Sequence, residues 1–338
     1  MQAVRRLSVS PGAVRKVALA SVVLYALLVL TGGAVRLTGS GLGCPDWPSC
    51  YQHRLLAAVS FHPMVEDLNR GFTVAVSVVS VVALVAALLR RPERRDISRP
   101  AFGLILGLVA QIVLGGLVVL FKLNPYLVAL HFILTIAVLA DAIWMYHRSR
   151  IPDATATGPV EPLVSRDLRW LVRVLLLALG VVTLAGTIVT GAGPHAGSPG
   201  APRVPLAFRD VAELHSSLAW LLLGLVTASQ FAFHHAKAPE RIQRRARTMF
   251  ELVIIQGALG YTQYFLHDAA YIVEFHLAGV TLLWIASIGL YLSLHEHAEP
   301  APAAQELGGG APAEVELATR LAAPAPVAPA SVTPFPAA

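Results

Sequence analysis

Three histidines and one asparagine recur at regular intervals inside long apolar segments of the sequence. His131 and His276 are 276 − 131 = 145 residues apart, and Asn69 and His215 are 215 − 69 = 146 apart. Within the two halves the separations are 131 − 69 = 62 and 276 − 215 = 61. Ionisable side chains inside apolar helices are costly and usually functional. Since imidazole is a common metal ligand, these four lattice positions predict a metal or cofactor site in the membrane.

The surroundings of these histidines favour haem iron over zinc. Zinc usually has four ligands close together, often with Cys or carboxylate among them, whereas two histidines on facing helices of an apolar bundle suit haem. We therefore expect His215 and His276 to be the axial ligands of a low-spin haem. In the first half the equivalent pair is Asn69 and His131. Because an amide is a poor ligand for haem iron, we expect a haem there to be bound by His131 alone, with an open sixth position.

Polar residues gather near Asn69 in the stretch VEDLNRGFTVAV, Val65 to Val76. Glu66 lies three residues before Asn69, on the same face of a helix, and would place a carboxylate beside the first-half pocket for proton transfer or charge stabilisation. A charge that complements the helix dipole is the alternative. Arg70 could pair with Glu66 or with a haem propionate.

The two cysteines, Cys44 and Cys50, lie in the segment GLGCPDWPSC. We expect this segment to be on the outer side, where disulfides persist. A bridge within this short loop is feasible. It could be a structural staple or a redox-active pair, and the sequence leaves both open.

The composition requires an integral membrane protein. Of 338 residues, 56% are hydrophobic and only 14% are charged, more apolar surface than a soluble domain could bury. The fold class we expect is all-α, with eight transmembrane helices arranged as two duplicated four-helix bundles. Segments of about 20 apolar residues predict the helices at 17–38, 66–89, 101–121, 125–147, 170–191, 208–233, 248–266 and 270–294.

The basic residues predict the orientation of these spans. In an eight-span arrangement, 20 of the 26 Lys and Arg residues fall on one side and 6 on the other. By the positive-inside rule both termini are cytoplasmic, and the net charge of +6 is explained without any nucleic acid. We expect the first apolar segment to remain as an uncleaved helix. The Ala- and Pro-rich tail is expected to be disordered.

An internal repeat supports the duplication. LTGSGLG at 37–43 is echoed by VTGAGPHAG at 189–197, and QIVLGGLVVL, starting at Gln111, by QGALGYTQYFL, starting at Gln256. Each half has an even number of spans, so both keep the same orientation. The expected organisation is a cytoplasmic N-terminus at 1–16, a first bundle at 17–147 with an outer loop at 39–65, a linker at 148–169, a second bundle at 170–294 and the tail at 295–338.

These motifs together resemble the haem A synthase family of integral membrane enzymes. The resemblance rests on TGGAVRLTGSGLGCPDWPSC, VEDLNRGF, QIVLGGLVVL followed by NPYLVALH, VTGAGPHAG, AELHSSLAW, QGALGYTQ and VEFHLAG, and covers about 17 to 294. It implies oxidation of the C8 methyl of haem O to a formyl, through hydroxylated intermediates, to give haem A for terminal oxidases. A membrane haem carrier or transporter, which binds haem without modifying it, is the alternative.

The resemblance also implies roles for individual residues. Glu66 matches the essential carboxylate of a Glu-x-x-His motif in which Asn69 replaces the histidine, and His131 matches the remaining histidine of the first half. His215 and His276 match the ligands of a haem b, and the first half receives haem O as substrate. The implied partners are haem O synthase, terminal oxidase assembly factors and the lipid bilayer of a bacterial inner membrane. Homo-oligomerisation is left open.

Overall fold

The protein is described by a computed structural model, which covers residues 8–50 and 59–298. Its elements in chain order are α1 Pro11–Leu37, α2 Phe61–Leu89, α3 Arg95–Leu120, α4 Pro125–Ser149, α5 Asp153–Ala156, β1 Val160–Pro162, α6 Arg166–Ala192, α7 Phe208–His235, α8 Glu240–Phe265, α9 Ala270–Leu292 and β2 His295–His297. The terminal segments 1–7 and 299–338, which include most of the expected tail, lie outside the described residues.

The helices begin where capping residues allow, often before the apolar segments that predicted them. Ser10 caps α1 by accepting a hydrogen bond from the Ala13 N–H, and Pro11 occupies the first turn. Asn124 caps α4 in the same way and is followed by Pro125. Both arrangements satisfy N–H groups that have no partner within the helix. Charged first turns extend α3, α6 and α8 beyond the apolar spans. The uncharged segment from Phe61 extends α2, which begins five residues before its expected start.

The described part of the chain contains seven helices that are long and apolar enough to cross a membrane: α1, α2, α3, α4, α6, α7 and α9. This establishes an all-helical, multi-pass membrane protein. Helix α8 has sufficient length, but it is less apolar because Glu251, Gln256 and Gln263 interrupt its hydrophobic part.

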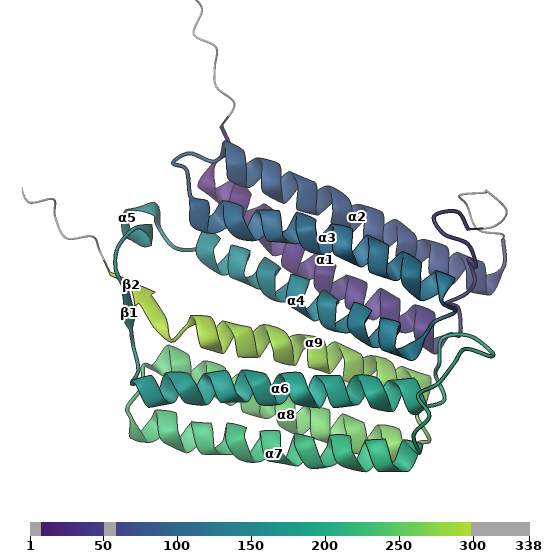
Figure 1. The fold of residues 1–338 in the computed structure, drawn as a ribbon. Coiled ribbons are helices and arrows are strands. Elements are labelled where there is room, and N and C mark those ends of the chain that lie inside the picture. The colour runs from purple at the N-terminus through teal and green to yellow at the C-terminus, as the bar shows by residue number, and fades with distance from the viewer. Residues whose placement is uncertain (1–7, 51–58, 299–338) are drawn as a thin grey trace, which may run out of the picture.

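The long helices form two groups of four (Figure 1). Helices α1 to α4 make the first group and α6 to α9 the second, while α4 and α9 pack against each other between them. One end of the molecule carries the Cys44–Cys50 loop and is called the disulfide end below. The opposite end, where α1 begins and α9 finishes, is called the arginine end.

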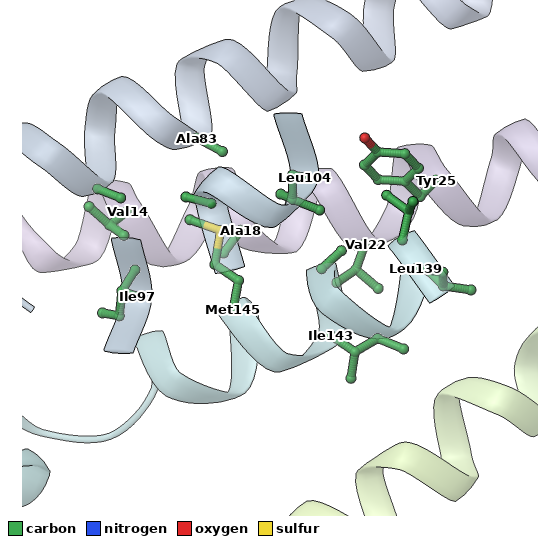
Figure 2. Packing of buried hydrophobic residues seen from close by; sticks show 14 of the residues in the cluster. Val14, Ala18, Val22, Tyr25, Ala83, Ile97, Leu104, Leu139, Ile143 and Met145 are labelled. Carbon is green, nitrogen blue, oxygen red and sulfur yellow. The ribbon is translucent and has the colours of Figure 1, made fainter. Parts of the chain in front are cut away.

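Each group has its own apolar core. In the first group, Val14, Ala18 and Val22 of α1 pack against Leu104 of α3 and Leu139 of α4 (Figure 2). Small residues such as Ala18 allow the helices to approach closely, as is usual in membrane bundles. A second cluster lies among α6 to α9. Trp284 and Tyr291 of α9 pack against both clusters and so join the groups.

The turns that join the last two helices of each group have the same shape. Lys122 and Leu123, between α3 and α4, have φ of 53° and 62°, and His267 and Asp268, between α8 and α9, have φ of 54° and 60°. The offset between the pairs is 267 − 122 = 145 residues. Because few side chains adopt positive φ, this agreement shows that the repeat extends to the backbone.

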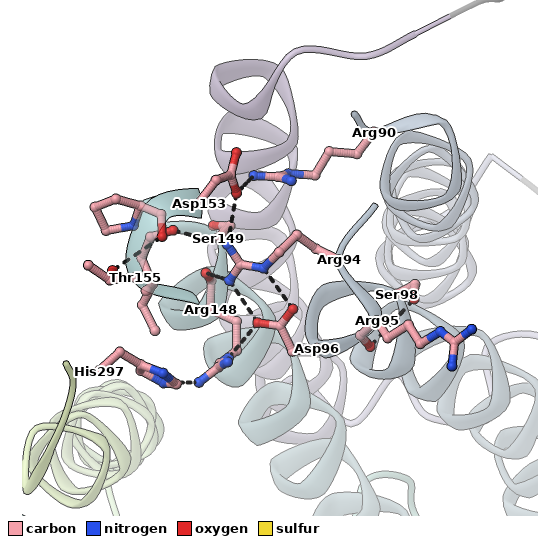
Figure 3. Close-up of polar contacts among 12 residues, drawn as sticks. Arg90, Arg94, Arg95, Asp96, Ser98, Arg148, Ser149, Asp153, Thr155 and His297 are labelled. Atoms are coloured by element: carbon pink, nitrogen blue, oxygen red, sulfur yellow. Dashed lines mark hydrogen bonds and ion pairs between the residues drawn. The ribbon is translucent and has the colours of Figure 1, made fainter. Parts of the chain in front are cut away.

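A network of ion pairs, in which buried arginines meet partly exposed aspartates, closes the arginine end (Figure 3). Arg90 and Arg94 donate to the Oδ1 of Asp153 at 2.6 and 3.0 Å, and Arg94 and Arg148 both donate to the Oδ2 of Asp96 at 2.7 Å. Burial acts to raise the pKa of Asp153, but the hydrogen bonds from Arg90 and Arg94 outweigh it and hold that pKa below 3.8.

The C-terminal strand extends this network to the second group. β2 pairs in antiparallel fashion with β1, in the connection between the two groups. Within β2, the His297 ring contacts Arg148 of α4. Burial and the charge of Arg148 lower the pKa of His297, which favours the neutral ring.

Candidate functional site

A single cavity of about 1230 Å³ contains the four lattice positions. Asn69 and His131 line it from the first group, and His215 and His276 from the second. The volume exceeds the roughly 300–1,000 Å³ of pockets for drug-sized ligands. The sequence predicted one pocket in each half, and the structure joins the two into one space.

His215 and His276 face each other across the second group. Their ring centroids are 6.5 Å apart and the ring planes are inclined by 72°. The Nδ1 of His215 lies 3.0 Å from the carbonyl oxygen of Val182. Since a carbonyl can only accept, Nδ1 carries the proton and Nε2 is left with a free lone pair.

This geometry suits one metal ion held between two imidazoles. Metal–imidazole bonds are about 2.0–2.1 Å long, so two rings on opposite sides of one ion have centroids roughly 6 Å apart. The Nδ1 of His276 is buried and has no hydrogen-bond partner among the described residues. A buried polar atom without a partner is uncommon, and a nitrogen of the His276 ring is therefore free for a ligand. With their ring separation and the cavity between the groups, the two residues fit the iron of a haem.

Small residues make room beside each histidine. A Cβ added to Gly186 would lie 3.1 Å from Cε1 of His215, and one added to Gly260 would lie 3.4 Å from Cε1 of His276. Gly115 stands in the same relation to His131, at 3.3 Å. Glycine at these places allows each ring to lie against the neighbouring helix.

His131 and His276 are also held alike. Gln111 of α3 donates to the backbone oxygen of His131 at 3.2 Å, and Gln256 of α8 donates to that of His276 at 2.9 Å. The Nδ1 of His131, like that of His276, is buried without a partner among the described residues. The two histidines thus occupy matching positions in the two groups.

Asn69 differs from the three histidines because it carries an amide in place of an imidazole, and its side-chain oxygen is already engaged. Its Oδ1 accepts a hydrogen bond of 2.8 Å from the Thr31 hydroxyl of α1. It joins α1 to α2 at the cavity wall, which leaves His131 as the imidazole of the first-group site.

Glu66 is 5% exposed and is held on both sides. Its Oε2 accepts the backbone N–H of Cys44 at 2.7 Å, and its Oε1 pairs with Arg70 at 2.8 Å. Arg70 also donates to the carbonyl oxygens of Cys44, Asp46 and Ser49. Glu66, one of the two partners expected for Arg70, pairs with it here, and the two side chains tie α2 to the loop that contains Cys44 and Cys50.

The segment from Cys44 to Cys50 is closed by a disulfide between these two residues, both fully buried. It places Trp47 over α3, where a Cβ on Gly116 would lie 2.7 Å from the indole ring. Trp47 and Pro48 therefore form part of the cavity wall. This part of the loop borders the cavity beside α3.

Sequence reasoning missed two contributors to the site. Trp47 lies in the segment GLGCPDWPSC and Arg36 in TGGAVRLTGSGLGCPDWPSC, but neither residue type nor spacing indicates a role in the site. Both line the cavity. Their positions depend on contacts between distant segments, for which residue spacing gives no signal.

Comparison with known proteins gives a consistent result. A family model described as cytochrome oxidase assembly protein, COX15-CtaA, matches residues 15–60 and 56–198. A protein named heme A synthase from Geobacillus thermodenitrificans is 35% identical over 156 residues, which are 44% of this chain and 48% of that protein. One of the same name from Geobacillus kaustophilus is 35% identical over 106 residues, 31% of this chain and 33% of its own. One from Listeria monocytogenes is 29% identical over 125 residues, 36% and 41% of the two chains. The chain thus spans about half the length, or less, of the curated relatives it matches.

Proposed function

This chain belongs to the COX15-CtaA family of cytochrome oxidase assembly proteins, and we propose that it is a haem A synthase. Its substrate is haem O, whose C8 methyl group it oxidises to a formyl through hydroxylated intermediates. The family model matches residues 15–60 and 56–198, which include Glu66 and both cysteines of the disulfide loop.

The observation that carries the proposal is the single cavity. It brings a facing histidine pair, suited to a resident redox cofactor, into the same space as Glu66 and His131. Oxidation of a methyl group requires electrons to leave the substrate and protons to be accepted. A cavity with an electron-transfer site in one group and a carboxylate in the other meets both needs.

In this proposal each residue has a defined task. His215 and His276 hold a haem b by its iron, and this haem supplies one-electron transfer. His131 holds the iron of haem O, while Asn69 fixes the wall of that site through Thr31. Glu66 accepts protons or stabilises positive charge during the oxidation, and Arg70 sets its orientation.

The arrangement in the membrane follows from the charges. We propose that α8 also crosses, giving eight spans as two duplicated four-helix bundles, with the disulfide end outside and the arginine end in the cytoplasm. The membrane is a bacterial inner membrane. The proposed partners are haem O synthase, which supplies the substrate, and the assembly factors of terminal oxidases, which receive haem A.

The direct test is chromatography of the haems extracted from the purified protein, expressed with and without haem O synthase. Haem A should be found only when haem O is supplied. Recovery of unmodified haem O alone would favour a haem carrier and would overturn the enzymatic proposal.

Single substitutions then separate the two sites. Glu66→Ala should leave a haem-containing protein that accumulates haem O or a hydroxylated intermediate, whereas full haem A production would rule out its role. His215→Ala or His276→Ala should abolish the low-spin b-type spectrum. His234→Ala, at the arginine end of α7, is the matched control and should leave the spectrum unchanged.

A further inference from the structure

Arg36 reaches from the first helix group into the second. It lies in the last turn of α1, at the disulfide end, and lines the cavity. Its Nε donates to the carbonyl oxygen of His195 at 2.7 Å and its Nη2 to that of Thr190 at 3.0 Å. Thr190 belongs to α6 and His195 to the loop that follows it, so the guanidinium is fixed against the second group.

The charge of Arg36 has no counter-ion in the described part of the chain. Both acceptors are neutral carbonyls, and none of the ion pairs among residues 8–50 and 59–298 includes Arg36. The carboxylate of Asp268 lines the same cavity, but its Oδ1 accepts from Gln263 at 2.8 Å. A cation at the wall of a membrane cavity is costly unless an anion compensates it. An anion that enters the cavity would compensate this charge.

The donors that remain on Arg36 suit a carboxylate. A guanidinium carries five N–H donors in a planar fork that matches carboxylate oxygens, and only two of its nitrogens donate to the protein. The two carbonyl bonds hold the side chain in place, so little further ordering is needed when an anion binds.

Depth decides which end of a ligand meets Arg36. His215 comes seven residues after the first residue of α7, and His276 six residues after the first residue of α9. Both helices begin at the disulfide end, so the two histidines lie on the order of 10 Å below it. Arg36 lies at that end. A haem held by the two histidines would meet Arg36 with the edge that points to the disulfide end, and propionates are the carboxylates that a haem carries on one edge.

We propose that Arg36 binds a propionate of the haem held by His215 and His276. The inference rests on the proposed function, because it requires that haem to be present. In this arrangement a residue of the first group holds the cofactor of the second. Retention of the cofactor therefore depends on the packing between the two groups as well as on the two histidines.

The test uses the purified holoprotein in detergent and the variants Arg36→Gln and Arg36→Lys. Two quantities are measured: the rate at which the b-type haem transfers to apomyoglobin, and the midpoint potential of the low-spin haem. Loss of a charge-assisted hydrogen bond, about 1.5–3 kcal/mol, corresponds to haem loss roughly ten- to hundred-fold faster in Arg36→Gln. The midpoint potential should fall, because an uncompensated propionate stabilises the ferric state. Arg36→Lys should show smaller changes of the same sign.

Arg203→Gln is the matched control. Arg203 donates to the carbonyl oxygen of Pro194 in the same loop, at 3.1 Å, but it is exposed and does not line the cavity. Its haem-loss rate and potential should equal those of the unchanged protein. If Arg36→Gln matches this control in both quantities, the inference is overturned. If Arg36→Gln does not fold, the test rests on Arg36→Lys. An unchanged haem-loss rate and an unchanged midpoint potential in Arg36→Lys would then overturn the inference.

Failure of the proposed function gives a different result. In that case the unchanged protein would contain no low-spin b-type haem, and both proposals would fall together. Haem in the unchanged protein with no effect of Arg36 would overturn this inference alone.

Discussion

The most specific prediction concerns the contact between Glu66 and the disulfide loop. Glu66→Gln keeps the size of the side chain but removes its charge, and so breaks the ion pair with Arg70 while leaving an oxygen for the Cys44 N–H. The side chains of Glu66 and Arg70 are 7% and 26% exposed. We expect the loop to open more readily, because the ion pair holds Glu66 and Arg70 in place for their hydrogen bonds to the loop.

The free-energy cost of Glu66→Gln depends on how well other groups still compensate the charge of Arg70. Removing one partner of a fully buried ion pair costs about 3–5 kcal/mol. Arg70 is one-quarter exposed and keeps three carbonyl acceptors, so the cost should be nearer that of one charge-assisted hydrogen bond, about 2 kcal/mol. Since about 1.4 kcal/mol is tenfold, the open loop should become roughly thirty times more populated.

Reduction of the disulfide reports this opening. Cys44 and Cys50 are fully buried, so a reductant reaches them only when the loop opens, and at low reductant concentration the rate follows the open population. The assay is reduction by a phosphine in native, purified protein, with the thiols trapped by a maleimide. Asp67→Asn is the control, because Asp67 makes no hydrogen bond or ion pair with a described residue. Equal reduction rates for Glu66→Gln and Asp67→Asn would refute the reasoning.

Three further predictions concern other parts of the molecule. Asn69→His places an imidazole opposite His131 and should add a second bis-histidine low-spin signal to the spectrum; such a signal in the unchanged protein would contradict our assignment of an open site. Gly103→Ala should destabilise the protein by about 1–3 kcal/mol, because the new Cβ would overlap Oδ2 of Asp141. Thermal unfolding in detergent measures this cost, which should largely vanish in an Asp141→Ala background; an equal cost in both backgrounds would argue against the overlap. The pKa of Asp153 is held below 3.8, so its ion pairs stabilise the fold above that pH, and this contribution is lost as the pH falls through the lower folded-state pKa. Asp153→Asn should therefore be less stable than the unchanged protein at neutral pH, and the two should converge in acid; a difference that persists in strong acid would show that the charge is not its source.

The sequence determined the membrane class, the approximate positions of the helices and the pairing of residues between the two halves. Composition and apolar segment length are sufficient for the first two, because a bilayer requires long apolar helices whatever their packing. The offset of 145 residues was visible because duplicated units keep their chemistry at fixed spacing. The structure bears it out at Gln111 and Gln256, which make the same hydrogen bond in the two groups.

Tertiary structure alone decided how these parts form one site. The joining of two pockets into one cavity, the contacts of Glu66 and Arg70 with the disulfide loop, and the reach of Arg36 into the second group all involve segments far apart in the chain. Most of these contacts end on backbone carbonyl and N–H groups, which every residue carries. Residue types and spacing therefore cannot reveal them, and only the packing of the helices brings the donors and acceptors together.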